Sequence, residues 1–218
     1  MPLFRVRNVE SARLAIWKTT ESPEELVANY PMLSLVYDEV CQRFKSLRRR
    51  QEFLAVRALL VEMSDGRLPI VTYDDNGKPL LDDGRKVSIS HTHGYAAVLL
   101  SENDEVGVDI EQRTDRVAKV ARLFVRDDEY CLQDGQPSSV AEGNDLPLDA
   151  LLVIWSAKEA VYKLFSAQKL AFMEMKVEPF SPQRKGMIKV ENLKSNVAVK
   201  VEYELTDDYV LTLCVLPE

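Results

Sequence analysis

The stretch that decides the fold is VGVDIE, at residues 106–111. Read as a strand, it points its side chains to alternate faces, so the three apolar residues share one face and Gly107, Asp109 and Glu111 share the other. Gly107 leaves room on that face for something to approach the backbone. Neighbouring carboxylates repel one another unless a cation lies between them, and Mg2+ prefers oxygen ligands of this kind. These six residues support a metal site and an exposed strand end with two solvated acids equally well.

A second stretch, residues 148–167, predicts a long helix that is apolar in its first turns. Ser156, Glu159 and Lys163 share one face of it through i, i+3 and i+7 spacing. On the simplest interpretation, Glu159 and Lys163 form only a surface ion pair worth ~0.3–0.5 kcal/mol. The apolar surroundings argue against this, because charged side chains on a mostly buried helix need partners.

Outward from these two stretches, the pattern predicts an α+β fold, because helices and strands segregate along the chain. We expect two similar halves, residues 1–105 and 106–218, each with a long helix packed on a small antiparallel sheet. A loop is expected at 133–147. A helix is expected from Glu24 to about Val61, and another after Glu111 from the spacing of Val117, Val120, Ala121 and Phe124. Strands are expected at residues 3–7, 11–18, 86–90, 95–100, 106–111, 188–190, 196–204 and 209–215.

The composition narrows the class of protein. A net charge of −7 argues against a general nucleic-acid binder. Two groups of basic residues, within residues 43–50 and 113–126, could still bind a small polyphosphate or an acidic partner. Basic groups of this kind are more often solvated residues on the surface of a helix. No apolar run approaches ~20 residues and the first residues lack a secretory signal. The three widely spaced cysteines indicate structural thiols in a reducing compartment. We therefore expect a cytoplasmic protein with no membrane partner.

His91 and His93 are the only histidines, and they follow the strand that ends at Ser90. A zinc site is disfavoured because no cysteine or third histidine lies nearby. We favour a hydrogen bond from one of the two to a phosphate, beside Ser90. Two ordinary turn histidines remain the alternative, for His93 in particular.

Four motifs follow one another along the chain: GKP at 77–79, VSISH at 87–91, GVDIE at 107–111, and WSAKEA at 155–160 with Lys163 after it. In this order they resemble the 4′-phosphopantetheinyl transferase superfamily. The similarity is greatest to the larger, surfactin-synthetase-activating type, in which one chain holds two similar halves. Arg122-Leu123-Phe124 followed by Glu129-Tyr130 also fits that family, and the resemblance runs from about Arg48 to Ala171.

The resemblance implies an activity and a set of catalytic residues. The family moves the phosphopantetheine arm of coenzyme A onto a serine of an apo acyl or peptidyl carrier protein, with Mg2+, and releases adenosine 3′,5′-bisphosphate. Asp109, Glu111 and Glu159 would bind the metal. Glu159 would also take the proton of the serine hydroxyl, directly or through a water. Lys163 would hold a phosphate oxygen as the charge shifts.

The resemblance also implies the coenzyme A contacts. Ser90 and His91 would contact the phosphates, and Lys78 would hold the nucleotide end. Lys158 belongs to the family signature and would support this site. The 3′-phosphate would bind to Arg48, with Arg49 and Arg50 as alternatives.

Each half is thereby expected to have its own task. Residues 1–105 would contact the nucleotide of coenzyme A, and residues 106–218 would hold the metal and dock the carrier, in a monomeric chain. The basic, partly apolar stretch from Arg116 to Arg126 would suit an acidic carrier domain. The 133–147 loop is longer and more polar than the resemblance leads one to expect, which leaves the choice of carrier open.

Two other functions compete with transfer. The same carboxylates and cations would serve a magnesium-dependent hydrolase of a nucleotide-like diphosphate. A non-catalytic module that binds coenzyme A or a carrier is the second alternative. The presence of all three acids and of Lys163 argues against the second.

Overall fold

The computed structural model describes residues 3–129 and 146–217. The chain forms two compact units, one from residues up to Val106 with the last two residues, and one from Gly107 to Leu216. Both contain antiparallel strands and a long helix, so the α+β prediction is confirmed. The division of tasks between residues 1–105 and 106–218 stays a prediction.

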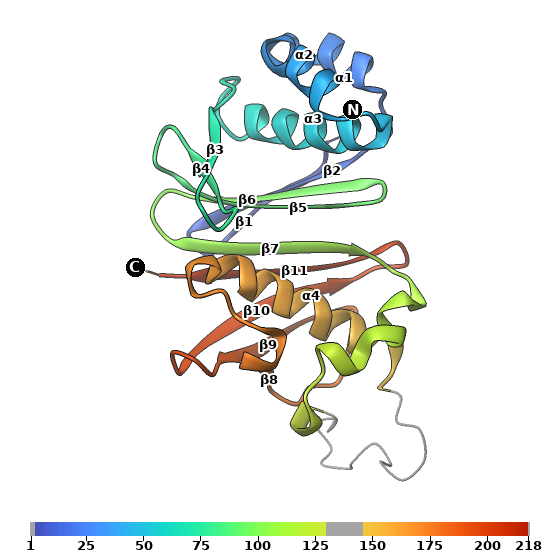
Figure 1. The fold of residues 1–218 in the computed structure, drawn as a ribbon, viewed down its shortest axis with the longest axis vertical. Coiled ribbons are helices and arrows are strands. Elements are labelled where there is room, and N and C mark those ends of the chain that lie inside the picture. Colours follow the sequence, from blue (N-terminus) through green and yellow to red (C-terminus); the bar gives the residue numbers. More distant parts are fainter. Residues whose placement is uncertain (1–2, 130–145, 218) are drawn as a thin grey trace. The chain divides into compact units, whose positions relative to one another are not determined.

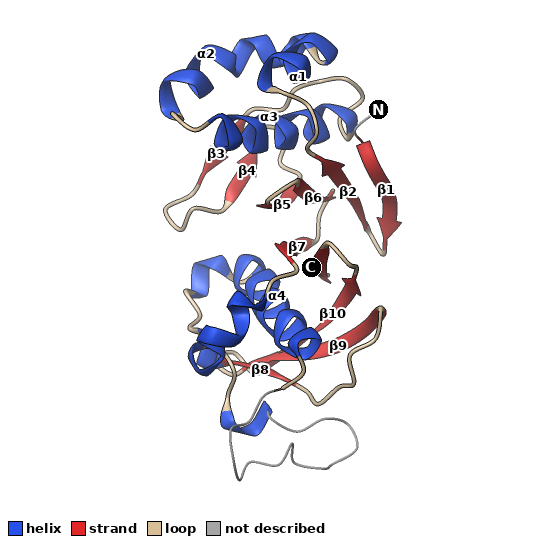
Figure 2. Ribbon diagram, turned by 90° about the vertical axis from the view of Figure 1, so that its right-hand side faces the viewer, coloured by secondary structure: helices blue, strands red, loops and turns tan. Residues whose placement is uncertain are grey.

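The first unit is built on a four-stranded antiparallel sheet of order β1-β2-β6-β5. Its helices lie on one face of this sheet (Figures 1 and 2). Apolar side chains of α3 (Leu47–Glu62) pack there against β2 and β6, and they form the core of the unit. The strands are β1 (Leu3–Val9), β2 (Ala12–Lys18), β5 (Lys86–Thr92) and β6 (Tyr95–Ser101).

The single helix expected from Glu24 to Val61 is wrong, because the chain breaks it twice. Pro31 has no N–H and disfavours helical backbone at the residue before it, so the first helix ends ahead of Tyr30. The second break lies at residues 44–46, where Phe44 is extended. Three segments precede α3: α1 (Pro23–Asn29), the 3₁₀ turn η1 (Pro31–Leu33) and α2 (Ser34–Arg43).

A small hairpin that the strand pattern did not predict joins α3 to β5. It pairs β3 (Val71–Tyr73) with β4 (Pro79–Leu81). The turn contains Gly77, whose φ of +80° suits glycine, and the Asp74 carboxylate accepts hydrogen bonds from two backbone N–H groups of this turn. The hairpin fixes the backbone at Lys78.

The second unit contains a five-stranded sheet of order β7-β11-β10-β9-β8. The helix α4 (Leu148–Leu164) lies across it and buries its apolar side chains against β11 and β10 (Figure 1). Strand β7 is the first in this order, so it is an edge strand of the sheet. The strands are β7 (Glu105–Gln112), β8 (Met175–Val177), β9 (Lys185–Asn192), β10 (Val197–Leu205) and β11 (Tyr209–Leu216).

The helix expected after Glu111 is present as the 3₁₀ helix η2 (Asp115–Leu123), not as an α-helix. With three residues per turn, Val117 and Val120 share one face of η2 and Ala121 lies a third of a turn away, so the expected stripe is split. Val117 and Phe124 are buried, whereas Val120 is 39% exposed. Three short turns complete the unit: η3 (Asp127–Glu129), η4 (Ser166–Gln168) and η5 (Phe172–Glu174). The predicted 133–147 loop lies, apart from its last two residues, outside the described residues.

Two further findings bear on the expected compartment. No helix within residues 3–129 or 146–217 is long and apolar enough to cross a membrane. Cys41 and Cys214 are free thiols, and burial raises the pKa of the Cys214 thiol to about 12. The cytoplasmic location stays a prediction.

Gly107 allows β7 to approach α4 closely. A Cβ atom at this position would lie 2.1 Å from the carbonyl oxygen of Ala160 and 3.0 Å from Sγ of Cys214. The sequence left open what approaches the backbone at Gly107, and the structure shows that it is the backbone of α4. This contact brings the Asp109 strand and the Glu159 helix together.

We predict that Gly107→Ala destabilises the protein by at least about 2 kcal/mol, because the added methyl group overlaps a backbone oxygen that has no side-chain freedom to move. Urea denaturation of the variant measures this loss. Met187→Ala, at an exposed position on β9, is the control and should change the free energy of unfolding little. Wild-type stability in Gly107→Ala would show that the two backbones are not in close contact.

Candidate active site

Asp109 lies at the centre of a buried polar cluster between β7 and α4. Its side chain is 3% exposed, so the interpretation of this residue as a solvated acid at a strand end is wrong. Lys163 Nζ donates to Oδ1 at 2.8 Å and also to the carbonyl oxygen of Val108 at 3.0 Å. Ser156 Oγ donates to the other carboxylate oxygen, Oδ2, at 2.9 Å. Both partners come from the helix face on which the sequence placed them.

The backbone of Ser156 is itself held in place by Thr212 of β11. Thr212 Oγ1 donates to the Ser156 carbonyl oxygen at 2.7 Å and lies 2.9 Å from Ser156 Oγ. Both residues are fully buried. Thr212 on β11 thus fixes the backbone of Ser156 on α4. The Ser156 hydroxyl, whose single proton goes to Asp109, fixes one oxygen of that carboxylate on β7.

Glu111 and Glu159 complete the acidic cluster. Trp155 Nε1 donates to Glu111 Oε1 at 3.2 Å. Burial raises the pKa of Glu111, and the charge of Asp109 adds to the effect. Burial also raises the pKa of Glu159 to about 7, with contributions from Asp109 and Glu111 that Lys163 opposes. Three carboxylates therefore share one ammonium group, and negative charge is in excess.

This donor set fits a hard divalent cation in its chemistry, since it offers only oxygen ligands and an unbalanced negative charge. Its present arrangement is different: within residues 3–129 and 146–217, no three His, Cys, Asp or Glu side chains are grouped closely enough to hold a metal ion. In this arrangement Lys163 and Ser156 bond to the oxygens of Asp109, and Trp155 bonds to one oxygen of Glu111.

Comparison with known proteins identifies the family. Residues 105–214 match the model of the 4′-phosphopantetheinyl transferase superfamily, and residues 42–101 match that of the 4′-phosphopantetheinyl transferase N-terminal domain. The chain belongs to the 4′-phosphopantetheinyl transferase superfamily. The first match takes in all three carboxylates and Lys163.

Individual relatives agree with this assignment. The chain is 33% identical over 119 residues to the 4′-phosphopantetheinyl transferase AcpT of Salmonella typhi, a match that covers 53% of this chain and 58% of the relative. It is 28% identical over 166 residues to AcpT of Escherichia coli K12, covering 74% of this chain and 82% of the relative. The chain thus spans a little over half the length of the Salmonella relative.

In the first unit of this superfamily member, a cationic group surrounds the buried carboxylate of Glu52 on α3. Arg48 Nε lies 2.8 Å and Arg49 Nη1 3.2 Å from its oxygens, and His91 Nδ1 lies 3.4 Å away. Arg50 is elsewhere, because its guanidinium donates to backbone carbonyls of Cys41 and Phe44 and caps the end of α2. Of the three alternatives for the 3′-phosphate, Arg48 and Arg49 are therefore the ones placed beside His91.

Ser90 and His91 do not lie together. Alternate residues of β5 point to opposite faces of the sheet, and His91 faces α3 while Ser90 is buried on the other face. A single phosphate bound on the α3 face therefore does not contact both side chains. Their roles in coenzyme A binding stay predictions, and the structure favours His91 as the partner of the arginines.

Lys78 is also engaged within the first unit. Its ammonium group pairs with the carboxylate of Glu105, to which Lys86 Nζ also binds at 3.0 Å. Two lysines thus share one carboxylate. The predicted contact between Lys78 and the nucleotide is untested.

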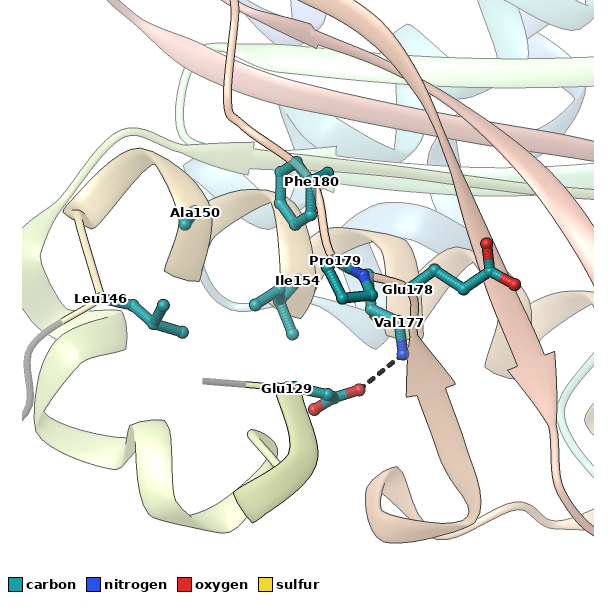
Figure 3. A pocket seen from close by; sticks show the side chains of 8 residues that line it. All are labelled: Glu129, Leu146, Ala150, Ile154, Val177, Glu178, Pro179 and Phe180. Carbon is teal, nitrogen blue, oxygen red and sulfur yellow. Dashed lines mark hydrogen bonds between the residues drawn. The ribbon is translucent and has the colours of Figure 1, made fainter. Parts of the chain in front are cut away.

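Lys158 lies in the core instead of on a coenzyme surface. Its side chain is fully buried, and Nζ donates to the carbonyl oxygens of Phe124 and Phe172 and to Glu129 Oε2 at 2.8 Å. The other oxygen of Glu129 accepts from the Val177 N–H at 2.6 Å, as Figure 3 shows. An ammonium with three acceptors has no N–H left for a phosphate. Lys158 therefore supports the fold behind the site.

The small cavity in Figure 3 is not a coenzyme site either. It is lined mainly by apolar side chains of α4 and of residues 177–180, with Glu129 at its edge. Its volume of about 10 Å³ is at the limit for a single water molecule.

Sequence reasoning missed two residues that organise these clusters. Glu52 had a local signal, because it lies four and three residues after Arg48 and Arg49 on one helix. Thr212 had none, since it is 56 residues from Ser156 and looks like any polar residue of a strand.

We predict that Glu159→Gln stabilises the metal-free protein by about 1–3 kcal/mol above pH 7. The pKa of Glu159 in the folded state is about 7, above its ordinary value of 4.5. The contribution of Glu159 to the free energy of unfolding is therefore highest below about pH 4.5, where Glu159 is protonated in both the folded and the unfolded chain, and it falls as the pH rises through 7. Glutamine does not ionise, so the variant avoids this loss.

Urea denaturation with a chelator, at pH values from 4 to 8, measures the difference between variant and wild type. The difference should grow from near zero at the acidic end to its full size above pH 7. Glu191→Gln on β9 is the control and should show no such trend. A difference that does not change with pH would contradict the electrostatic account of the cluster.

Proposed function

We propose that the protein transfers the 4′-phosphopantetheine group from coenzyme A to a serine of an apo carrier protein, releasing adenosine 3′,5′-bisphosphate. The observation that carries this proposal is the cluster of Asp109, Glu111 and Glu159 with Lys163, in a chain of the phosphopantetheinyl transferase superfamily. The names of the AcpT relatives support it.

The proposed cofactor is Mg2+, held by Asp109, Glu111 and Glu159. These residues supply the oxygen ligands that magnesium prefers, and their mutual repulsion gives a divalent cation a favourable place. When bound, the ion would neutralise charge on the pyrophosphate of coenzyme A.

The chain's own residues would perform the proton and charge steps. The serine oxygen attacks the β-phosphorus of coenzyme A, and the bond from that phosphorus to the bridging oxygen breaks as adenosine 3′,5′-bisphosphate leaves. Glu159 would take the hydroxyl proton, directly or through a water. Lys163 would stabilise a phosphate oxygen as negative charge shifts toward the leaving group.

Residues of the first unit would bind the nucleotide. The arrangement of side chains around Glu52 favours Arg48 or Arg49, with His91, for the 3′-phosphate, and Lys78 for another part of the nucleotide. We also propose that the chain is a monomer of the larger, surfactin-synthetase-activating type. Support comes from the two family models, which match one unit each.

The direct test incubates the protein with coenzyme A, Mg2+ and a panel of fatty-acid, polyketide and nonribosomal-peptide apo carriers. We expect intact-mass spectrometry to show addition of phosphopantetheine to the serine of at least one carrier. Glu159→Ala should lower the rate at least about 100-fold, because it removes both a metal ligand and the base, whereas Glu178→Ala, at a surface position, should not. Free phosphopantetheine without carrier modification would instead support the hydrolase alternative.

We further propose that η2 docks the carrier. It exposes Arg116 and Lys119, and its apolar residues Val120 and Leu123 are 39% and 62% exposed. An open groove of about 480 Å³ continues this surface and is lined by Arg122, Val125, Arg126, Asp127, Asp128 and Met173. Positive charge around exposed apolar side chains suits an acidic domain that presents an apolar helix face.

Charge reversal at Arg116 and Lys119 together should raise the KM for the carrier about tenfold while coenzyme A binding is unchanged, because the attraction to the acidic partner becomes repulsion. Steady-state kinetics with varied carrier, and a coenzyme A titration, measure the two effects. Lys200→Glu, on β10, is the matched control. If the carrier KM were unaffected, η2 would not be the docking surface.

A further inference from the structure

The two oxygens of Asp109 are held by donors of different kinds. Oδ1 accepts from the ammonium of Lys163, a charged group on a flexible stem that is 26% exposed. Oδ2 accepts from the hydroxyl of Ser156, a neutral and fully buried residue whose backbone carbonyl accepts from Thr212. One donor brings a positive charge that is able to move, and the other brings only orientation.

We propose that Lys163 is a stand-in cation, which pairs with Asp109 in the metal-free protein and must leave Oδ1 before a divalent cation binds there. Ser156 has the opposite effect, because it holds the carboxylate in place for the metal. This inference rests on the proposed function, in which Asp109 is a metal ligand.

The charge balance of the cluster supports a competition of this kind. Lys163 bonds to Asp109 and so places a positive charge beside this carboxylate. A divalent cation would do the same with twice the charge, and two cations so close together repel each other.

The hydrogen bonds of Ser156 support its positioning role. Groups that hydrogen-bond to metal ligands orient them, and their loss typically costs 10–100-fold in metal affinity. Ser156 has this relation to Asp109, at 2.9 Å in a fully buried environment, and Thr212 binds the Ser156 carbonyl oxygen at 2.7 Å.

The competition has a functional consequence. A substrate phosphate that draws Lys163 away from Asp109 would raise the affinity of the protein for the cation. By thermodynamic linkage, the bound cation would raise the affinity of the protein for that phosphate by the same factor. The same lysine would thus hold Asp109 in the resting protein and a phosphate oxygen in the loaded one.

The test is a titration of the metal-free protein with Mn2+, without coenzyme A, in which electron paramagnetic resonance reports the free ion. Lys163→Met should bind Mn2+ at least about tenfold more tightly than wild type, because it removes the competing charge. Lys163→Arg keeps that charge and should stay within about twofold of wild type. Ser156→Ala should bind about tenfold more weakly. Displacement of Mn2+ by Mg2+ should give the same order.

Matched variants control for general effects on the fold. Lys176→Met removes a lysine that pairs with Asp128 elsewhere in the second unit, and Ser166→Ala removes a buried hydroxyl near the end of α4. Both should bind Mn2+ like wild type. Circular dichroism melting identifies unfolded variants, and the comparison of Lys163→Met with Lys163→Arg at a partly exposed position remains decisive if Ser156→Ala does not fold.

Measurable binding by Lys163→Met but not by wild type would support the competition. Equal affinities of Lys163→Met, Lys163→Arg and wild type, or no binding by any of them, would overturn it. Failure of the proposed function appears separately, as a lack of modification of every carrier in the mass-spectrometric assay, whatever the order of Mn2+ affinities.

Discussion

The close approach of β7 to α4 is the constraint on which the rest of the second unit depends. Only a residue without a side chain at position 107 allows the strand to lie against the carbonyl oxygen of Ala160. Once the two backbones are this close, side chains on facing positions are forced together. Asp109 then meets Ser156 and Lys163, and Glu111 meets Trp155. One packing contact both closes the core and assembles the acidic cluster.

The cluster lowers the stability of the fold that contains it. Burial and like charges raise the pKa of Glu159 to about 7, so at neutral pH the protein keeps carboxylates in an unfavourable environment with one lysine among them. Proteins retain such arrangements where function requires them. The nearby Lys158–Glu129 pair is different: each charge has its hydrogen-bond partners and lies deep in the core. Lys158 therefore stabilises the core, whereas Lys163, five residues later and 26% exposed, belongs to the acidic cluster.

Local patterns predicted much of this arrangement. The period-two alternation of 106–111 placed Asp109 and Glu111 on one strand face, and helical spacing placed Ser156 and Lys163 on one helix face. These patterns do not reveal which elements lie close together, and Lys163 binds Asp109 although 54 residues separate them. They also did not reveal the breaks in the 24–61 segment, which depend on Pro31 and on how Arg50 caps α2. A signature motif also does not reveal which way each side chain points, so Lys158 looked like a coenzyme contact although it is fully buried and its ammonium has three acceptors.

The central claim is that Asp109, Glu111 and Glu159 act as one metal site. Anomalous diffraction from crystals grown with Mn2+ and coenzyme A tests it most directly. We expect a manganese peak within coordination distance of oxygens from all three residues, with Lys163 Nζ no longer bound to Oδ1 of Asp109. A manganese peak that contacts none of them, or an unchanged Lys163–Asp109 pair beside bound coenzyme A, would contradict this account.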